Sequence, residues 1–166
     1  MNERRAMGRL RSAFRGAVLG LGLAAALGAC GDAMLSGPPE LHVGRDECAG
    51  CGMILNDAKC AGALLVAENG TRAHLLFDDI GCMVEFERDH SPVVVSRFVH
   101  DYARGAWTDA ADAVFVVSDA GHIATPMGSG TVAYADAAAA AAKAGESQGK
   151  VVRWSDLLAS APSGPR

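Results

Sequence analysis

The strongest constraint on the fold is an order of local signals that occurs twice along the chain. In the first copy an apolar run over 61–67 precedes Asn69-Gly70, the dipeptide most typical of a two-residue β-hairpin. A second strand is predicted over 72–77, a helix over 80–88 behind two aspartates, and a β-branched third strand over 92–99. This order predicts a small β-β-α-β unit.

The second copy follows the same order with different residues. Strands are predicted over 113–118, 130–134 and 150–154, and a helix over 137–144 behind Asp136. The helix is nearly all alanine, which has the highest intrinsic helix propensity. We interpret the repeated order as an internal duplication, although convergent patterning would give the same order because the two copies share few identical residues.

The fold class predicted from these signals is α+β, with two similar small ββαβ halves. The first half, together with a cysteine-containing loop ahead of it, is predicted over 45–104 and the second half over 105–166. A chain of 166 residues is close to the usual size of one domain. Half of the residues are hydrophobic but only 5% are aromatic, so a thin core of Val, Leu and Ala is expected.

The first 29 residues have the pattern of an export signal. Basic residues come first, followed by an apolar run over 17–27 that is too short to span a bilayer comfortably. Leu27-Gly28-Ala29-Cys30 resembles the bacterial lipobox, which predicts cleavage after Ala29 and a lipid on Cys30. An uncleaved anchor helix and a plain cleaved signal are the alternatives. The expected location is therefore a bacterial membrane, with the protein anchored by lipid and facing the periplasm.

The region after the signal is expected to be flexible and acidic. Residues 30–44 are predicted to be the lipidated N-terminus and a tether, because they contain Gly, Ser and Pro38-Pro39. Removing residues 1–29 leaves 10 basic and 18 acidic residues, a net charge of −8. Binding to nucleic acid needs clustered Lys and Arg, so that class of partner is excluded.

Two thiols and a thioether lie within six residues of one another in the loop Glu47-Cys48-Ala49-Gly50-Cys51-Gly52-Met53. Such soft ligands favour Cu(I) over hard cations, and the glycines allow the backbone to turn several sulfurs toward one point. On this loop alone, a Cys48–Cys51 disulfide or a redox pair of the thioredoxin type is an equally good interpretation.

Four motifs in order resemble those of the NosL family, lipoproteins that accompany nitrous oxide reductase. They are the loop over 47–53, FDDIGCM over 77–83, Asp101-Tyr102 with WTDA over 107–110, and TPMGSG over 125–130. The resemblance implies a protein that is not an enzyme but binds Cu(I) and delivers it for the copper centres of that reductase. Nitrous oxide reductase or its assembly machinery would be the partner. Cys60 has no evident role in the family and is expected to be a buried apolar thiol.

The predicted ligand set combines the cysteine loop with a methionine from the second half. Cys51 and Met53 are candidates from the loop, with Cys48 within reach. Met127 lies between Pro126 and Gly128, which favours presentation on a loop, and the family motif supports its inclusion. Cys48 and His122 are the additional or alternative ligands.

Other chemistry-bearing residues favour structural roles. Cys82 and Met83 are expected to pack in the core, and Asp78 and Asp79 to cap the helix that follows them. No catalytic constellation is present. The best alternative function is a membrane-anchored thiol–disulfide oxidoreductase using Cys48 and Cys51, and a four-cysteine zinc site is disfavoured because the chain has no second close pair.

Overall fold

The computed structural model describes residues 34–119 and 121–160. The predicted signal peptide and the lipidation site at Cys30 lie outside these residues. Within the described part, no helix has both the length and the apolar character needed to cross a membrane.

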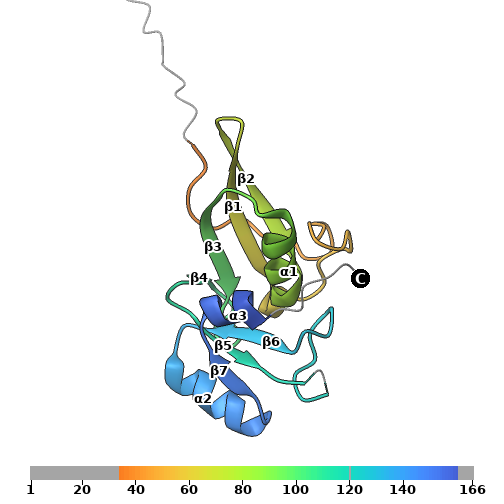
Figure 1. Ribbon diagram of the computed structural model, residues 1–166. Helices are drawn as coiled ribbons and strands as arrows, with labels where there is room; N and C mark the ends of the chain where they lie inside the picture. Colours follow the sequence, from red (N-terminus) through yellow and green to blue (C-terminus); the bar gives the residue numbers. More distant parts are fainter. Residues whose placement is uncertain (1–33, 120, 161–166) are drawn as a thin grey trace, which may run out of the picture. The chain divides into compact units, whose positions relative to one another are not determined.

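The first half is a four-stranded antiparallel sheet with a helix on it (Figure 1). The sheet order is β2-β1-β3-β4, formed by β1 (Gly62–Glu68), β2 (Thr71–Phe77), β3 (Val94–His100) and β4 (Trp107–Asp109). Helix α1 (Ile80–His90) packs on β1 and β2. A short 3-10 turn, η1 (Ala58–Cys60), precedes β1. The predicted hairpin is present, with Asn69 and Gly70 at positive φ between the paired residues Glu68 and Thr71.

The second half repeats the arrangement with shorter strands. Its sheet order is β6-β5-β7, formed by β5 (Val114–Val117), β6 (Thr131–Tyr134) and β7 (Lys150–Val152). Helix α2 (Ala137–Glu146) begins after Asp136, whose side chain accepts the N–H groups of Ala138 and Ala139. In both halves the first strand lies between the second and the third, which confirms the predicted pair of ββαβ halves.

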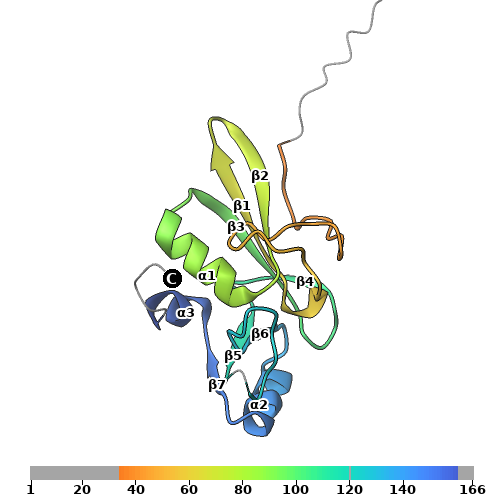
Figure 2. The same cartoon turned by 90° about the vertical axis from the view of Figure 1, so that its right-hand side faces the viewer.

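Two elements differ from the sequence-based prediction. Strand β4 was not predicted, and the last predicted strand stops at Val152 because helix α3 (Trp154–Ser160) begins there. The N–H of Arg153 donates to Asp156 Oδ2 at 2.9 Å, which caps the new helix. The Trp154 ring packs 5.6 Å from that of Phe115, so burial of Trp154 favours the helical turn. Helices α1 and α3 lie side by side (Figure 2).

Asp101 joins the end of the first sheet to the second. Its carboxylate is 2% exposed and accepts three backbone N–H groups, from Ala103, Arg104 and Ala135, at 2.7–2.9 Å. Asp101 also forms an isolated parallel bridge with Ala133 on β6. The two halves are therefore held together by buried polar contacts as well as by apolar packing.

Part of the segment predicted as a tether lies against side chains of β2. Arg72 Nη1 donates to the carbonyl of Leu35 at 3.1 Å, and a hydrogen bond of 2.9 Å joins His74 Nε2 to the carbonyl of Gly37. Leu41 packs against the core. These contacts place the chain from Leu35 onward on the folded body.

Candidate metal site

The cysteine loop is a tight turn attached to β2. The N–H of Gly52 donates to the carbonyl of Cys48 and the N–H of Cys48 to that of Met53, each at 2.8 Å. Gly52 has φ +73°, a conformation that favours glycine. The N–H of Ala49 donates to the carbonyl of Leu76 at 2.7 Å. The loop is therefore held beside the end of β2, where Asp78 follows.

Three thiols and a carboxylate converge at this point. The Sγ atoms of Cys48, Cys51 and Cys82, which we call the thiol cluster, and a carboxylate oxygen of Asp78 all lie within 4.8 Å of one another. Cys82 comes from the first turn of α1 and Asp78 from the link between β2 and α1. Cys48 is 2% exposed and Cys82 9%, whereas Cys51 is exposed. The cluster thus has a buried side and an open side.

The thiol cluster favours a negative charge on Cys48. The neighbouring Cys82 thiol lowers the pKa of Cys48 to about 4, against the effect of burial, with help from the N–H groups of Asp78, Cys51 and Gly50. The same contact with Cys48, together with burial, raises the pKa of Cys82. The pair therefore shares one proton, which Cys82 keeps.

Asp78 adds a buried carboxylate to the cluster. It has no exposed surface, and neither side-chain oxygen meets hydrogen-bonding geometry with a partner in residues 34–119 and 121–160. Burial, followed by the charge of Cys48, raises the pKa of Asp78 to about 6. A buried, ionised carboxylate beside a thiolate is costly unless it takes up a proton or a cation binds there. The donor set of this site therefore fits a metal ion.

Asp79 holds the loop that carries Met127, in the second half, close to the start of α1. Asp79 caps α1 by accepting the N–H of Gly81 at 2.7 Å through Oδ1. Its Oδ2 accepts the Thr125 hydroxyl at 2.7 Å and the N–H of Met127 at 3.0 Å. One aspartate thus fixes both the start of α1 and the loop that carries Met127.

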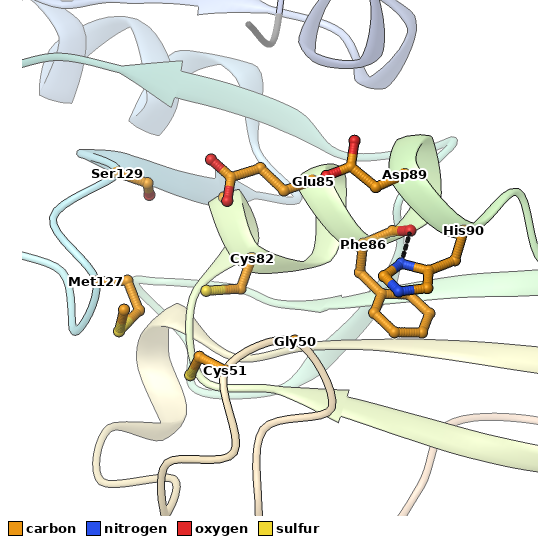
Figure 3. Close-up of a pocket in the computed structure, with 10 residues that line it drawn as sticks. Gly50, Cys51, Cys82, Glu85, Phe86, Asp89, His90, Met127 and Ser129 are labelled. Atoms are coloured by element: carbon orange, nitrogen blue, oxygen red, sulfur yellow. Dashed lines mark hydrogen bonds between the residues drawn. The ribbon is translucent and has the colours of Figure 1, made fainter. Parts of the chain in front are cut away.

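A cavity of about 250 Å³ opens between these elements. Cys51, Cys82 and Met127 line one end, and Figure 3 shows them coming from three different segments toward the same space. The other lining residues run along α1 and the facing loops: Gly50, Gly81, Glu85, Phe86, Asp89, His90 and Ser129. The cavity gives solvent a path to the thiol of Cys82, which is otherwise buried.

The structure brings together some of the predicted ligands and leaves others apart. Cys48, Cys51 and Met127 lie at the site, whereas the Met53 side chain is 51% exposed and does not line the cavity. His122 is exposed on the loop after β5 and does not line the cavity either. Cys60 is fully buried in the core of the second half, as expected, and burial raises its pKa to about 12.

Two residues of the cluster were not expected there. Cys82 packs in the core as predicted, yet its sulfur also faces Cys48 and the cavity. Asp79 is the helix cap, while Asp78, predicted to share that role, points to the thiols. The only sequence signal for either residue was a thiol in the first turn of a helix preceded by two carboxylates.

Comparison with known proteins identifies the family of the chain. A solved structure described as the copper chaperone NosL from Shewanella denitrificans is similar, with a TM-score of 0.59 and 21% sequence identity. The similarity covers 72% of this chain and 96% of that chain. No curated protein matches the chain. The NosL family model matches residues 41–161, so the chain belongs to the NosL family.

Proposed function

We propose that this protein is a Cu(I) carrier that supplies copper for assembly of the copper centres of nitrous oxide reductase. The observation that carries the proposal is the meeting of Cys51, Cys82 and Met127 at one cavity beside the buried Asp78 carboxylate. Thiolate and thioether sulfur bind Cu(I) well and hard cations poorly. The description of the similar Shewanella denitrificans protein as a copper chaperone supports copper as the cargo.

Cys51 and Met127 are the proposed central ligands, because both line the cavity. Met53 is the proposed third ligand, since it lies two residues from Cys51 and its exposed side chain is free to rotate toward the ion. Cys48 is an additional ligand on the buried side. His122 is the alternative ligand, and its binding to the ion would require movement of the loop that carries it.

The setting in the cell is part of the same proposal. Export by the predicted signal and a lipid on Cys30 would hold the protein on a bacterial membrane, facing the periplasm, where nitrous oxide reductase or its assembly machinery would be the recipient. The protein has no enzymatic role in this proposal. The exposed Cys51 and the open end of the cavity support transfer, because an incoming ligand reaches the metal there.

The alternative is a thiol–disulfide oxidoreductase using Cys48 and Cys51. The low pKa of Cys48 favours it, because reactive thiols are thiolates at neutral pH. However, Cys48 is 2% exposed and lies in a loop, whereas an exchanging thiolate must meet its substrate. Burial of the low-pKa thiol therefore favours the carrier.

A competition titration tests the proposed function. The reduced chain without residues 1–29 should bind close to one Cu(I), measured against a chromogenic Cu(I) chelator, and should bind Zn(II) much more weakly. Thioether ligation is the physical reason for the difference, because it contributes to Cu(I) binding and little to Zn(II) binding. Equal affinity for the two ions would contradict a soft-ligand site.

A further inference from the structure

We propose a further activity at this site: Cys48 and Cys82 reduce Cu(II) to Cu(I) by forming a disulfide, while Cys51 and Met127 keep one Cu(I). The inference rests on the proposed function for the identity of the metal. In this inference the two buried thiols of the cluster donate electrons, and the exposed thiol retains the metal.

The first support is the position of the two buried sulfurs. The Sγ atoms of Cys48 and Cys82 lie within 4.8 Å of each other, and the Cys82 thiol is the leading hydrogen-bonding contact of Cys48. The loop backbone also contacts the start of α1, since a Cβ added to Gly50 would lie 3.5 Å from the Cβ of Cys82. A disulfide needs a sulfur separation of about 2 Å, so the two sulfurs move closer together as the bond forms.

The second support is that Cu(I) does not need all of the sulfur present. Cu(I) is satisfied by two to four soft ligands, and Cys51, Met127 and Met53 provide three. Cys51 and Met127 face the cavity, so they remain in place when the buried pair is oxidised. Cys48 is only an additional ligand in the proposed set and Cys82 is not one of its ligands, so the pair can give up two electrons while the other three sulfurs retain the ion.

The third support is access. Cys82 lines the cavity that reaches Cys51 and Met127, so an ion entering from solvent meets a member of the buried pair beside the two retaining ligands. Glu85 and Asp89 also line this cavity, and carboxylates attract a divalent cation. Reduction of Cu(II) and retention of Cu(I) thus take place at a single cavity.

The step balances with Cu(II) as the oxidant. One S–S bond forms between the Cys48 thiolate and the Cys82 thiol, the Cys82 S–H bond breaks, and its proton leaves to solvent. Two Cu(II) ions gain one electron each and become two Cu(I) ions. One Cu(I) stays with Cys51 and Met127, and the second leaves the protein. Without a dithiol reductant to restore the pair, the reaction runs once per chain.

Copper(II) added to the reduced chain under anaerobic conditions tests the inference. We expect about two Cu(I) per chain, measured with a chromogenic Cu(I) chelator, because forming a disulfide releases two electrons.

Mass spectrometry of the oxidised protein should show the loss of two hydrogens. Trypsin cuts after Arg45, Lys59, Arg72 and Arg88, so a Cys48–Cys82 disulfide joins peptides 46–59 and 73–88, whereas a Cys48–Cys51 disulfide stays within one peptide. Fragmentation between Cys48 and Cys51 distinguishes Cys48 from Cys51 in the joined pair.

Two variants complete the test. Cys82→Ser should remove the joined peptides and slow Cu(I) production at least tenfold, with the rate expressed per Cu(I) that the reduced variant binds. Cys60→Ser is the matched control, because Cys60 is a buried thiol in the core of the second half, and its Cu(I) yield should equal that of the wild type. Both variants are first checked for folding by circular dichroism.

The outcomes separate this inference from the proposed function. Absence of Cu(I) production, or a disulfide confined to peptide 46–59, overturns the inference while leaving Cu(I) binding intact. Failure of the reduced wild type to bind added Cu(I) overturns the proposed function. Wild-type reduction rates in Cys82→Ser would also overturn the inference.

Discussion

Asp79 accepts the backbone N–H of Met127 at 3.0 Å, across 48 residues of sequence. The same carboxylate caps α1, whose first turn carries Cys82. The distance between the Met127 loop and the thiol cluster therefore depends on a residue that is not itself a proposed ligand. Such a positioning residue links the strength of metal binding to the integrity of a helix cap.

Removal of the Asp79 side chain should lower both stability and copper affinity. Asp79→Ala loses the cap and the bonds to the Met127 loop, so we expect a loss of about 2 kcal/mol in the free energy of unfolding. Cu(I) affinity should fall about tenfold, because Met127 is no longer held in place. Urea unfolding and chelator competition measure the two effects.

Asp136→Ala is the control for this experiment. Asp136 caps α2 in the same way, through the N–H groups of Ala138 and Ala139, but lies in the second half away from the cavity. It should cost about 1 kcal/mol of stability and leave Cu(I) affinity unchanged. Equal losses of copper affinity in the two variants would show that general destabilisation, and not the Met127 loop, is responsible.

Met127→Leu tests the ligand that comes from the second half. Leucine keeps the volume and apolar character of methionine, so the apo variant should melt near the wild type. Only the thioether is lost, and Cu(I) affinity should fall at least tenfold. The thermal shift on adding Cu(I) should shrink in parallel, because that shift follows from affinity for the folded state. A folded variant with wild-type affinity would assign Met127 to packing.

Substitutions of the loop cysteines distinguish a carrier from an oxidoreductase. Cys51→Ser should abolish Cu(I) binding and Cys48→Ser should only weaken it, because Cys51 lines the cavity and Cys48 lies on the buried side. In an oxidoreductase both substitutions would be equivalent, since either one removes the disulfide. Turnover by the wild type in an insulin-reduction assay would support the oxidoreductase.

Asp101 makes the joint between the halves depend on pH. Burial alone would raise the pKa of Asp101, but hydrogen bonds from the N–H groups of Ala135, Arg104 and Ala103 outweigh it and lower the pKa. A depressed folded-state pKa contributes stability above the unfolded value of about 4, and that stability is lost as pH falls through the folded-state pKa.

The substitution Asp101→Asn should therefore cost about 2 kcal/mol at neutral pH and progressively less below pH about 4. Urea unfolding of both proteins from pH 7 to pH 3 measures the difference. A cost that is the same at every pH would mean that the charge of Asp101 contributes nothing to the joint.

The sequence was sufficient for elements that depend on local signals. Asn69-Gly70 specifies its hairpin, Asp79 and Asp136 specify helix starts, and β-branched residues specify β3, so the ββαβ order was predictable. Strand β4 has three residues and exists because it pairs with β3, which no local pattern reveals. Helix α3 takes Trp154 out of the predicted strand because the ring is buried against Phe115.

The site shows the same division between local and long-range information. Cys48 and Cys51 are close in sequence, so their proximity was predictable, and the Pro and Gly beside Met127 indicated a loop. Cys82 was predicted to be a core residue because its position in the first turn of a helix does not by itself show which residues its side chain faces. Its place opposite Cys48 results from the hydrogen bond that holds the loop on β2, between Ala49 and Leu76.

The contacts made by the edge strand β2 bear on whether two molecules of the protein associate through their sheets. An uncovered edge strand offers free backbone groups to strands of other molecules and is a common start of aggregation. Here the N–H of Ala49 bonds to the Leu76 carbonyl at one end of β2, and the side chains of Arg72 and His74 bond to the incoming chain near the other end. In the proposed lipid-anchored state, copies crowd on a surface and collide often. On such a surface, the bond from Ala49 leaves the Leu76 carbonyl unavailable to a strand of another copy.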